Sequence, residues 1–138
     1  MIKRLALITL IFFTLPCSAA NLQITEAWIK NLPMVVPMRA GYMNITNKGS
    51  SKIAIESLAS ESFAKIEIHQ SIEIDGMMSM QPIPGLAVLP GESIQLEPGG
   101  YHLMMMSPLQ DLKLGDEIIV TLRFDDQTTQ TIIMIVRK

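Results

Sequence analysis

The sequence predicts an all-β fold, an antiparallel sandwich or barrel, and three observations carry this prediction. Short runs of alternating apolar and polar residues recur along most of the 138 residues. Turn-forming Gly, Pro, Asn and Asp separate these runs at short intervals. No window shows the 3.6-residue period of a long amphipathic helix. The chain length suits a single hydrophobic core, so we expect one domain.

The first half of the domain is predicted to hold four strands. The run 22–30 alternates in part and contains the only tryptophan. A loop is expected over 31–38, because its two prolines cannot donate to a strand ladder. The run 40–47 alternates polar residues with Met and Ile. After a KGSS turn, the runs 52–59 and 63–71 read as two further strands.

The second half begins at Asp75-Gly76, a dipeptide typical of two-residue hairpin turns. Beyond it we expect five strands bounded by Gly, Pro or Asp residues: 77–83, 93–97, 101–106, 117–124 and 128–136. A short helical turn is expected near 108–113. The last two strands are predicted to form a closing hairpin through Asp125-Asp126-Gln127.

The segment 1–20 is predicted to be a cleaved signal peptide, which leaves 21–138 as the folded domain. It has a positively charged start, and its apolar run 5–15 has the length of a signal-peptide core and is too short to span a bilayer. The small residues Ser18-Ala19-Ala20 fit a cleavage site. We therefore expect an exported protein.

Without this segment the chain carries nine basic and thirteen acidic residues, a net charge of −4. A mildly acidic domain without basic clusters argues against nucleic acid or an anionic membrane as partner. No later stretch reaches eighteen apolar residues, so stable membrane insertion is not expected. The only cysteine is Cys17. Pro16 before it is not the small residue that a lipid-attachment site prefers, so we expect Cys17 to leave with the signal peptide.

The two histidines lie in two of the predicted strands. In 63–71, strand alternation places His69 on the face of Lys65 and Glu67, which predicts an accessible side chain at the strand end. In 101–106, His102 shares a face with Met104 and Met106. Residues two apart on a strand lie about 7 Å apart and point the same way, so one metal ion can bind between them.

A third element brings a thioether toward His69. If the hairpin turns about Asp75-Gly76, residues that pair across it have numbers that sum to about 151. His69 then pairs near residue 82 and is a diagonal neighbour of Met80. An imidazole and a thioether are thus expected close together from local sequence alone.

Imidazole and thioether ligands together suit soft, monovalent copper. A structural zinc site favours thiolates or more histidines, and the predicted domain has no cysteine. Calcium and magnesium favour clustered oxygen ligands, which the sequence does not show. A blue-copper electron-transfer centre is excluded, because it requires a cysteine. We find no pattern of paired carboxylates, Ser-His-Asp residues or a phosphate loop, so no enzyme is predicted.

The spacing His-x10-Met-x21-His-x-Met, formed by His69, Met80, His102 and Met104, resembles the copper-binding motif of the PCu(A)C family of exported bacterial copper chaperones. Neighbouring stretches are similar to that family as well: AWIK, AGYMNITNKG, EIH at 67–69, PGGYHLMMM at 98–106 and LKLGDEIIVTLRF at 112–124. The similarity covers nearly all of the predicted domain.

The resemblance implies a cupredoxin-like Greek-key antiparallel β-sandwich that binds Cu(I) through these four residues. It also implies a periplasmic role in delivering copper to the copper subunit of cytochrome c oxidase, alongside Sco-type thiol proteins. Two features differ from the family pattern. Many members carry a further methionine soon after the first histidine, where this chain has Gln70 and Ser71. Some members bind Cu(II) through a His- and Met-rich C-terminal extension, whereas this chain ends in IIMIVRK.

The other methionines have less specific interpretations. Met43, Met105 and Met134 are expected in the core, together with Trp28. Met34 and Met38 lie in the loop 31–38, either as sulfurs that pass copper to the site or as ordinary surface packing. Met78 and Met106 share the predicted faces of Met80 and Met104, so we expect them beside the site.

Two other functions are open. The alternatives to a copper carrier are a β-sandwich adhesion or assembly module whose methionines only pack, and a copper-dependent redox enzyme. Thioethers that favour Cu(I) argue against redox turnover. A monomer is expected, with a copper-bridged dimer as the alternative.

Overall fold

A computed structural model describes residues 21–138, which form ten strands. The strands are β1 (Leu22–Lys30), β2 (Met38–Asn47), β3 (Ile53–Ala59), β4 (Phe63–Ile74), β5 (Met77–Ile83), β6 (Leu86–Val88), β7 (Ser93–Leu96), β8 (Tyr101–Pro108), β9 (Glu117–Phe124) and β10 (Thr129–Arg137). These described residues contain no helix that could cross a membrane. The all-β prediction is confirmed, while the predicted signal peptide, with Cys17, lies outside the described residues.

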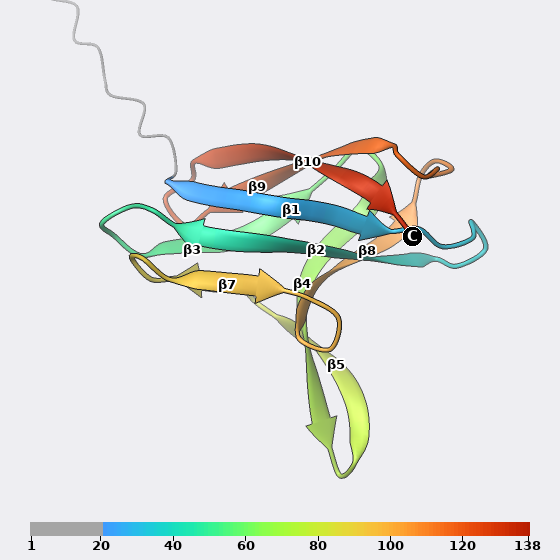
Figure 1. Ribbon diagram of the computed structural model, residues 1–138, viewed down its shortest axis with the longest axis horizontal. Helices are drawn as coiled ribbons and strands as arrows, with labels where there is room; N and C mark the ends of the chain where they lie inside the picture. The colour runs from blue at the N-terminus through green and yellow to red at the C-terminus, as the bar shows by residue number, and fades with distance from the viewer. Residues whose placement is uncertain (1–20) are drawn as a thin grey trace, which may run out of the picture.

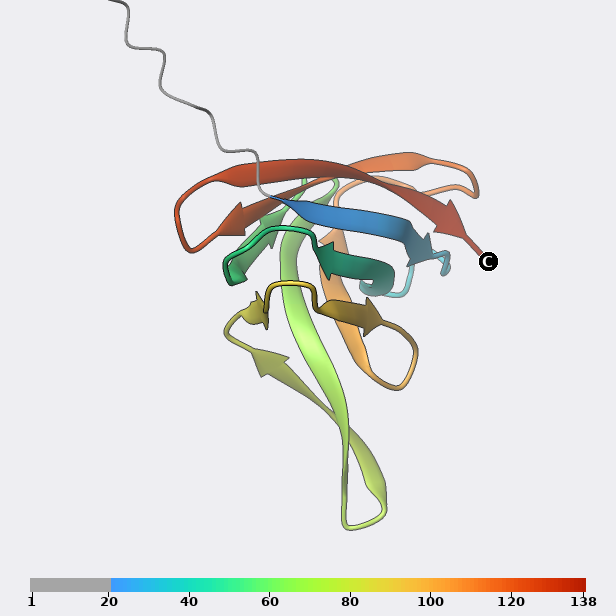
Figure 2. The ribbon, with the colours of Figure 1, turned by 60° about the vertical axis from the view of Figure 1, so that its left-hand side comes forward.

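The strands form one sheet that closes on itself. Its order is β5-β4-β8-β7-β2-β1-β10-β9-β3-β6, and additional pairings join β4 to β3 and β8 to β2. Most neighbours run antiparallel, whereas β1 pairs with β10, and β7 with β8, in parallel. The result is a closed sandwich, from which the long β4–β5 hairpin projects (Figures 1 and 2).

The β4–β5 hairpin has the turn and the register that its sequence predicts. Asp75 and Gly76 both adopt positive φ, at 51° and 78°, as a two-residue type I′ turn requires. Across this turn Ser71 pairs with Met80 and His69 with Pro82, so the predicted sum of 151 is confirmed. β4 continues to Ile74, three residues beyond its predicted end, because β5 pairs with it up to the turn.

The core lies between the inner faces of the closed sheet. Alternation along β8 buries Leu103 and Met105 completely, and each such side chain contributes about 1.5–3 kcal/mol by leaving water. Met43 and Met134 are buried as predicted. Trp28 is only half-buried, because a bulge between Thr25 and Trp28 shifts the alternation and turns its ring against Tyr42.

Two local predictions were wrong. The three-residue strand β6 was missed, because Pro and Gly on both sides made its segment read as a loop. The segment 108–113 contains no helical turn. Pro108 still belongs to β8 and pairs with Phe63, and the amide of Leu109 donates to the carbonyl of Ser62 at 2.9 Å. A contact with the β3–β4 turn thus replaces the local hydrogen bonds of a helix.

Candidate metal centre

His69 and His102 are direct neighbours on two adjacent strands. The β4–β8 register pairs them, their ring centroids lie 5.9 Å apart, and the ring planes are tilted by 45°. His69 is 7% exposed and His102 is 4% exposed. The expectation of an accessible His69 was therefore wrong. β4 does not end there, and His69 lies between Pro82 of β5 and His102 of β8.

Each histidine has one ring nitrogen held by a hydrogen bond and one without a partner. His69 Nε2 lies 2.9 Å from a Glu67 carboxylate oxygen, and His102 Nδ1 lies 3.2 Å from the Gly100 carbonyl oxygen. Because both partners only accept, these two nitrogens are the ones that donate. The other two, His69 Nδ1 and His102 Nε2, are buried without a partner, and each carries a lone pair in the neutral form of its ring. Such lone pairs are what a metal ion binds.

The same face of the sheet carries the two candidate thioethers. Met80 pairs with Ser71, two residues after His69, and Met104 pairs with Glu67, two residues before it. Residues opposite one another or two apart share a face, so the register brings all four candidate ligands to one side. Met80 is 59% exposed, whereas Met104 is half-buried.

A pocket of about 300 Å³ opens beside these side chains. Met80, His102 and Met104 line it, together with Ser71. The rest of its wall is mainly apolar but includes one charged residue, Arg39, and it consists of Leu32, Val36, Met38, Arg39, Ala40, Tyr42, Pro98 and Gly99. An apolar wall excludes water and strengthens bonds between soft ligands and a weakly hydrated ion.

The segment that carries the four candidate ligands is acidic. From Ile66 to Leu112 the chain contains no lysine or arginine but six acidic residues, which are Glu67, Glu73, Asp75, Glu92, Glu97 and Asp111. Hydrogen bonds from His69 and then Lys65 hold the pKa of the Glu67 carboxyl below its ordinary value, so it stays ionised at neutral pH.

The donor set limits the metals that fit. Within residues 21–138, no three His, Cys, Asp or Glu side chains gather as a metal site. Two neutral imidazole nitrogens with two thioether sulfurs match Cu(I) and are a poor match for zinc, calcium or magnesium.

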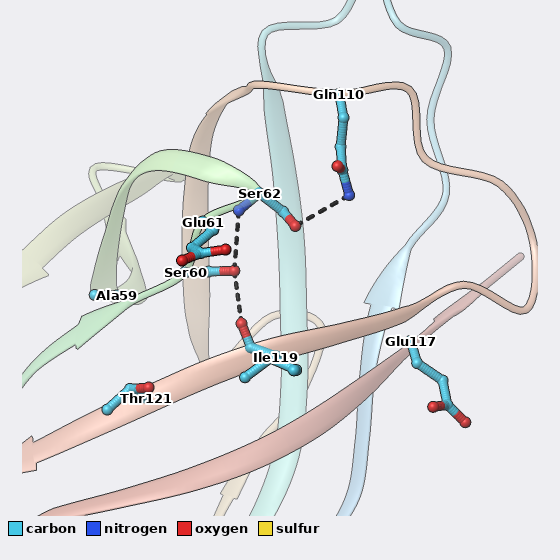
Figure 3. Close-up of a pocket in the computed structure, with 8 residues that line it drawn as sticks. All are labelled: Ala59, Ser60, Glu61, Ser62, Gln110, Glu117, Ile119 and Thr121. Atoms are coloured by element: carbon cyan, nitrogen blue, oxygen red, sulfur yellow. Dashed lines mark hydrogen bonds between the residues drawn. The ribbon is translucent and has the colours of Figure 1, made fainter.

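Another depression, of about 790 Å³, lies between the β3–β4 turn and β9 (Figure 3). Its polar groups bind one another: Ser60 Oγ donates to the Ile119 carbonyl at 2.6 Å, and Gln110 Nε2 donates to Ser62 Oγ at 3.1 Å. No histidine or methionine lines it. Because the hydroxyl of Ser60 and the amide of Gln110 donate within the protein, we assign no function to this depression.

Two features of the site were missed from sequence. Glu67 is the hydrogen-bond partner of His69, and its position two residues earlier on the same strand face was a usable signal. The second is the carbonyl of Gly100, which holds His102 and has no side-chain signal that could have revealed it.

Comparisons with known proteins identify the family and the fold. The family model described as "Putative lipoprotein LpqE-like" matches residues 22–136. A protein of Leifsonia xyli subsp. xyli named "Putative lipoprotein Lxx21020" is 30% identical over 115 residues, which cover 83% of this chain and 68% of that protein.

Two solved structures share the fold. The copper-bound PCuAC domain from PmoF2 superposes with a TM-score of 0.70 at 17% identity, over 85% of this chain and 92% of that one. The Cu(I)-bound solution structure of DR1885 from Deinococcus radiodurans superposes with a TM-score of 0.67 at 26% identity. The match covers 81% of this chain and 75% of that one. The fold is thus the cupredoxin-like β-sandwich of PCuAC domains, as expected. Because the family model spans nearly all of the described residues, the chain belongs to the LpqE-like family, which is the PCu(A)C family that its sequence resembles.

Proposed function

We propose that the protein is a periplasmic copper chaperone that binds one Cu(I) through His69 Nδ1, His102 Nε2 and the sulfurs of Met80 and Met104. The observation that carries this proposal is the pair of buried ring nitrogens without partners. A buried polar atom without a partner costs about 1–3 kcal/mol. The two ring nitrogens belong to histidines that pair directly on adjacent strands, and binding a metal ion between them offsets this cost.

The remaining hydrogen bonds of the histidines support the same reading. Glu67 and the Gly100 carbonyl fix the tautomer of each ring, so that the free nitrogen of each is the one left for a metal. Metal-binding histidines commonly use their second nitrogen in this way, bonded to a carboxylate or a backbone carbonyl. The two copper-containing structures with the same fold also support copper as the cargo.

Delivery, in contrast to storage, is supported by the exposure of Met80. A ligand that is 59% exposed on a projecting hairpin is within reach of an acceptor protein, which can replace it while the other ligands still hold the ion. Neutral ligands also bind Cu(I) less tightly than thiolates, which favours release to a thiol acceptor. The acceptors that we propose are the copper subunit of cytochrome c oxidase and a Sco-type thiol protein.

Export is supported by the signal-like segment 1–20 and by the lipoprotein names of the family and of the Leifsonia relative. Mass spectrometry of the protein from a periplasmic or membrane fraction tests the processing that we expect. A chain beginning at Asn21 agrees with it. A lipid-modified Cys17 at the N-terminus shows a membrane-anchored chaperone instead.

The binding itself is tested by titrating the protein of residues 21–138 with Cu(I) against a chromophoric Cu(I) chelator. We expect one Cu(I) per chain, with both nitrogen and sulfur scatterers in its X-ray absorption spectrum. Failure to compete with the chelator, or a copper environment without sulfur, contradicts the proposed site. A module whose methionines only pack gives no Cu(I) binding at all. Loss of the copper from the loaded protein to a purified acceptor domain then tests delivery.

A further inference from the structure

Two further methionines lie on the same sheet face as the proposed copper ligands. The β2–β8 register pairs Met38 with Met106 and Ala40 with Met104. Met106 is two residues after Met104 on β8, so both side chains point to the face that carries His102. The sequence left the role of Met38 open and placed Met106 only by the alternation of its own strand. The register places the two side by side.

Space for the thioether of Met38 to approach the copper site exists at Ala40. Its short side chain opposes Met104, and the pocket lined by Met80, His102 and Met104 is also lined by Ala40 and Met38. Directly opposed Cβ atoms lie about 4.5–5.5 Å apart, and diagonal ones lie about 7–8 Å apart. Because methionine has three rotatable bonds beyond its Cα, such neighbours can bring their sulfurs to one ion.

Met38 does not resemble the methionines that pack in the core. Met43, Met105 and Met134 show what packing methionines look like in this protein, since each is at most 2% exposed. Met38 is 44% exposed, and its neighbour Met34 in the preceding loop is 48% exposed.

The loop that ends at Met38 is held in place by a buried cation. The guanidinium of Arg39 donates to the carbonyl oxygens of Val36, Met38 and Pro33 at 2.7, 3.0 and 3.2 Å. Arg39 is only 2% exposed, so these bonds lie largely out of water. The sulfur of Met38 therefore extends from a fixed backbone at the rim of the pocket.

Two cationic side chains lie near these methionines, and both have partners within the protein. Lys65 pairs with Met106 on the other side of β8, and its ammonium forms an ion pair with Glu67 at 2.5 Å. The guanidinium of Arg39 also lines the pocket, and it donates to the carbonyl oxygens of the loop before β2.

We propose that Met38 and Met106 form a second, thioether-only Cu(I) site through which the ion moves to and from Met104. This inference rests on the proposed function. In the transfer step, Met38 or Met106 sulfur bonds to the ion while a bond to another ligand breaks. Copper stays Cu(I), and no proton moves, because thioethers are neutral in both states. Without an imidazole this site is the weaker of the two, as a transfer site must be.

Ag(I), a soft monovalent ion of the same ligand preference, is the probe for this site. The protein of residues 21–138, labelled with ¹³C in its methionine methyl groups, is titrated with Ag(I) and followed by NMR. The first equivalent should shift the methyl signals of Met80 and Met104. Further Ag(I) should shift those of Met38 and Met106, whereas the core methyl of Met134 should not move.

The variant M38L/M106L keeps the side-chain volumes and should fold like the parent. It should retain the first Ag(I) event, lose the second, and release Cu(I) to a chromophoric chelator more slowly. M77L is the matched control, since Met77 is exposed on the opposite face of the β4–β5 hairpin and should change neither event. The proposal is overturned if Met38 and Met106 do not respond to excess Ag(I), or if M38L/M106L releases copper at the parent rate. Absence of the first event as well overturns the proposed function along with it.

Discussion

Replacing Met80 and Met104 together with leucine should remove copper binding while leaving the fold intact. Met80 is 59% exposed and Met104 is half-buried, so neither is part of the tightly packed core. Leucine has a similar volume, and such exchanges cost less than about 1.5 kcal/mol even in a core. The metal-free M80L/M104L variant should therefore unfold within a few degrees of the parent.

The copper-loaded proteins should differ much more. A ligand present at a hundredfold excess over its Kd stabilises the folded state by about 2.7 kcal/mol. With about 2.1 cal/mol/K of unfolding entropy per residue over roughly 118 residues, this corresponds to a rise in Tm of about 11 °C. If the variant binds a hundredfold more weakly, the same free Cu(I) adds only about 0.4 kcal/mol, or about 2 °C.

Thermal unfolding without Cu(I) and at a buffered free Cu(I) concentration measures the Tm of each metal-free protein and its rise with copper. M77L serves as the control, because Met77 lies on the same strand but on the opposite face, and it should keep the full rise of the parent. The assignment of the two thioethers is wrong if M80L/M104L shows that full rise. If the Tm of the parent does not rise either, the parent does not bind Cu(I) at the buffered concentration.

Three further predictions concern single side chains outside the four ligands. E67A should weaken Cu(I) binding by about 10–100-fold in a titration against a chromophoric chelator, because the ring of His69 loses its hydrogen-bond partner. E67Q should lose less Cu(I) affinity, because its amide oxygen still accepts that hydrogen bond. N47A should lower the free energy of unfolding by about 1–3 kcal/mol without changing copper affinity, because buried Asn47 makes three hydrogen bonds of 2.8–2.9 Å that join the turn after β2 to β6. Hydrogen bonds from Thr128 lower the pKa of the Asp126 carboxyl. The ionised carboxylate therefore stabilises the folded protein at pH values above the unfolded pKa of about 3.9. This stabilisation is lost as the pH falls through the folded pKa. The stability difference between the parent and D126A, measured by urea unfolding, should thus shrink below about pH 4, and a difference that grows there contradicts this assignment.

Local sequence predicted the features that depend on a strand and its nearest turn. Alternation along 101–106 separated the buried Leu103 and Met105 from the ligand face of His102 and Met104, and the structure agrees. Asp75-Gly76 determined the β4–β5 register, because a two-residue turn leaves one way to pair the strands that it joins. The choice of the four ligand residues came from their spacing and from the family resemblance. That choice stays a prediction until copper binding is measured.

The tertiary structure alone decided how strands far apart in the sequence pair. β4 and β8 share no short turn, so nothing local predicts that His69 lies directly opposite His102, or that β8 covers His69 from water. The same holds for β2 and β8, whose register places Met38 beside Met106. A shift of one residue in such a pairing moves every side chain to the other face, and the packing of the whole core selects the register that buries Leu103 and Met105. The sequence thus determined which side chains share each strand face, and the closed sheet determined which of those faces meet.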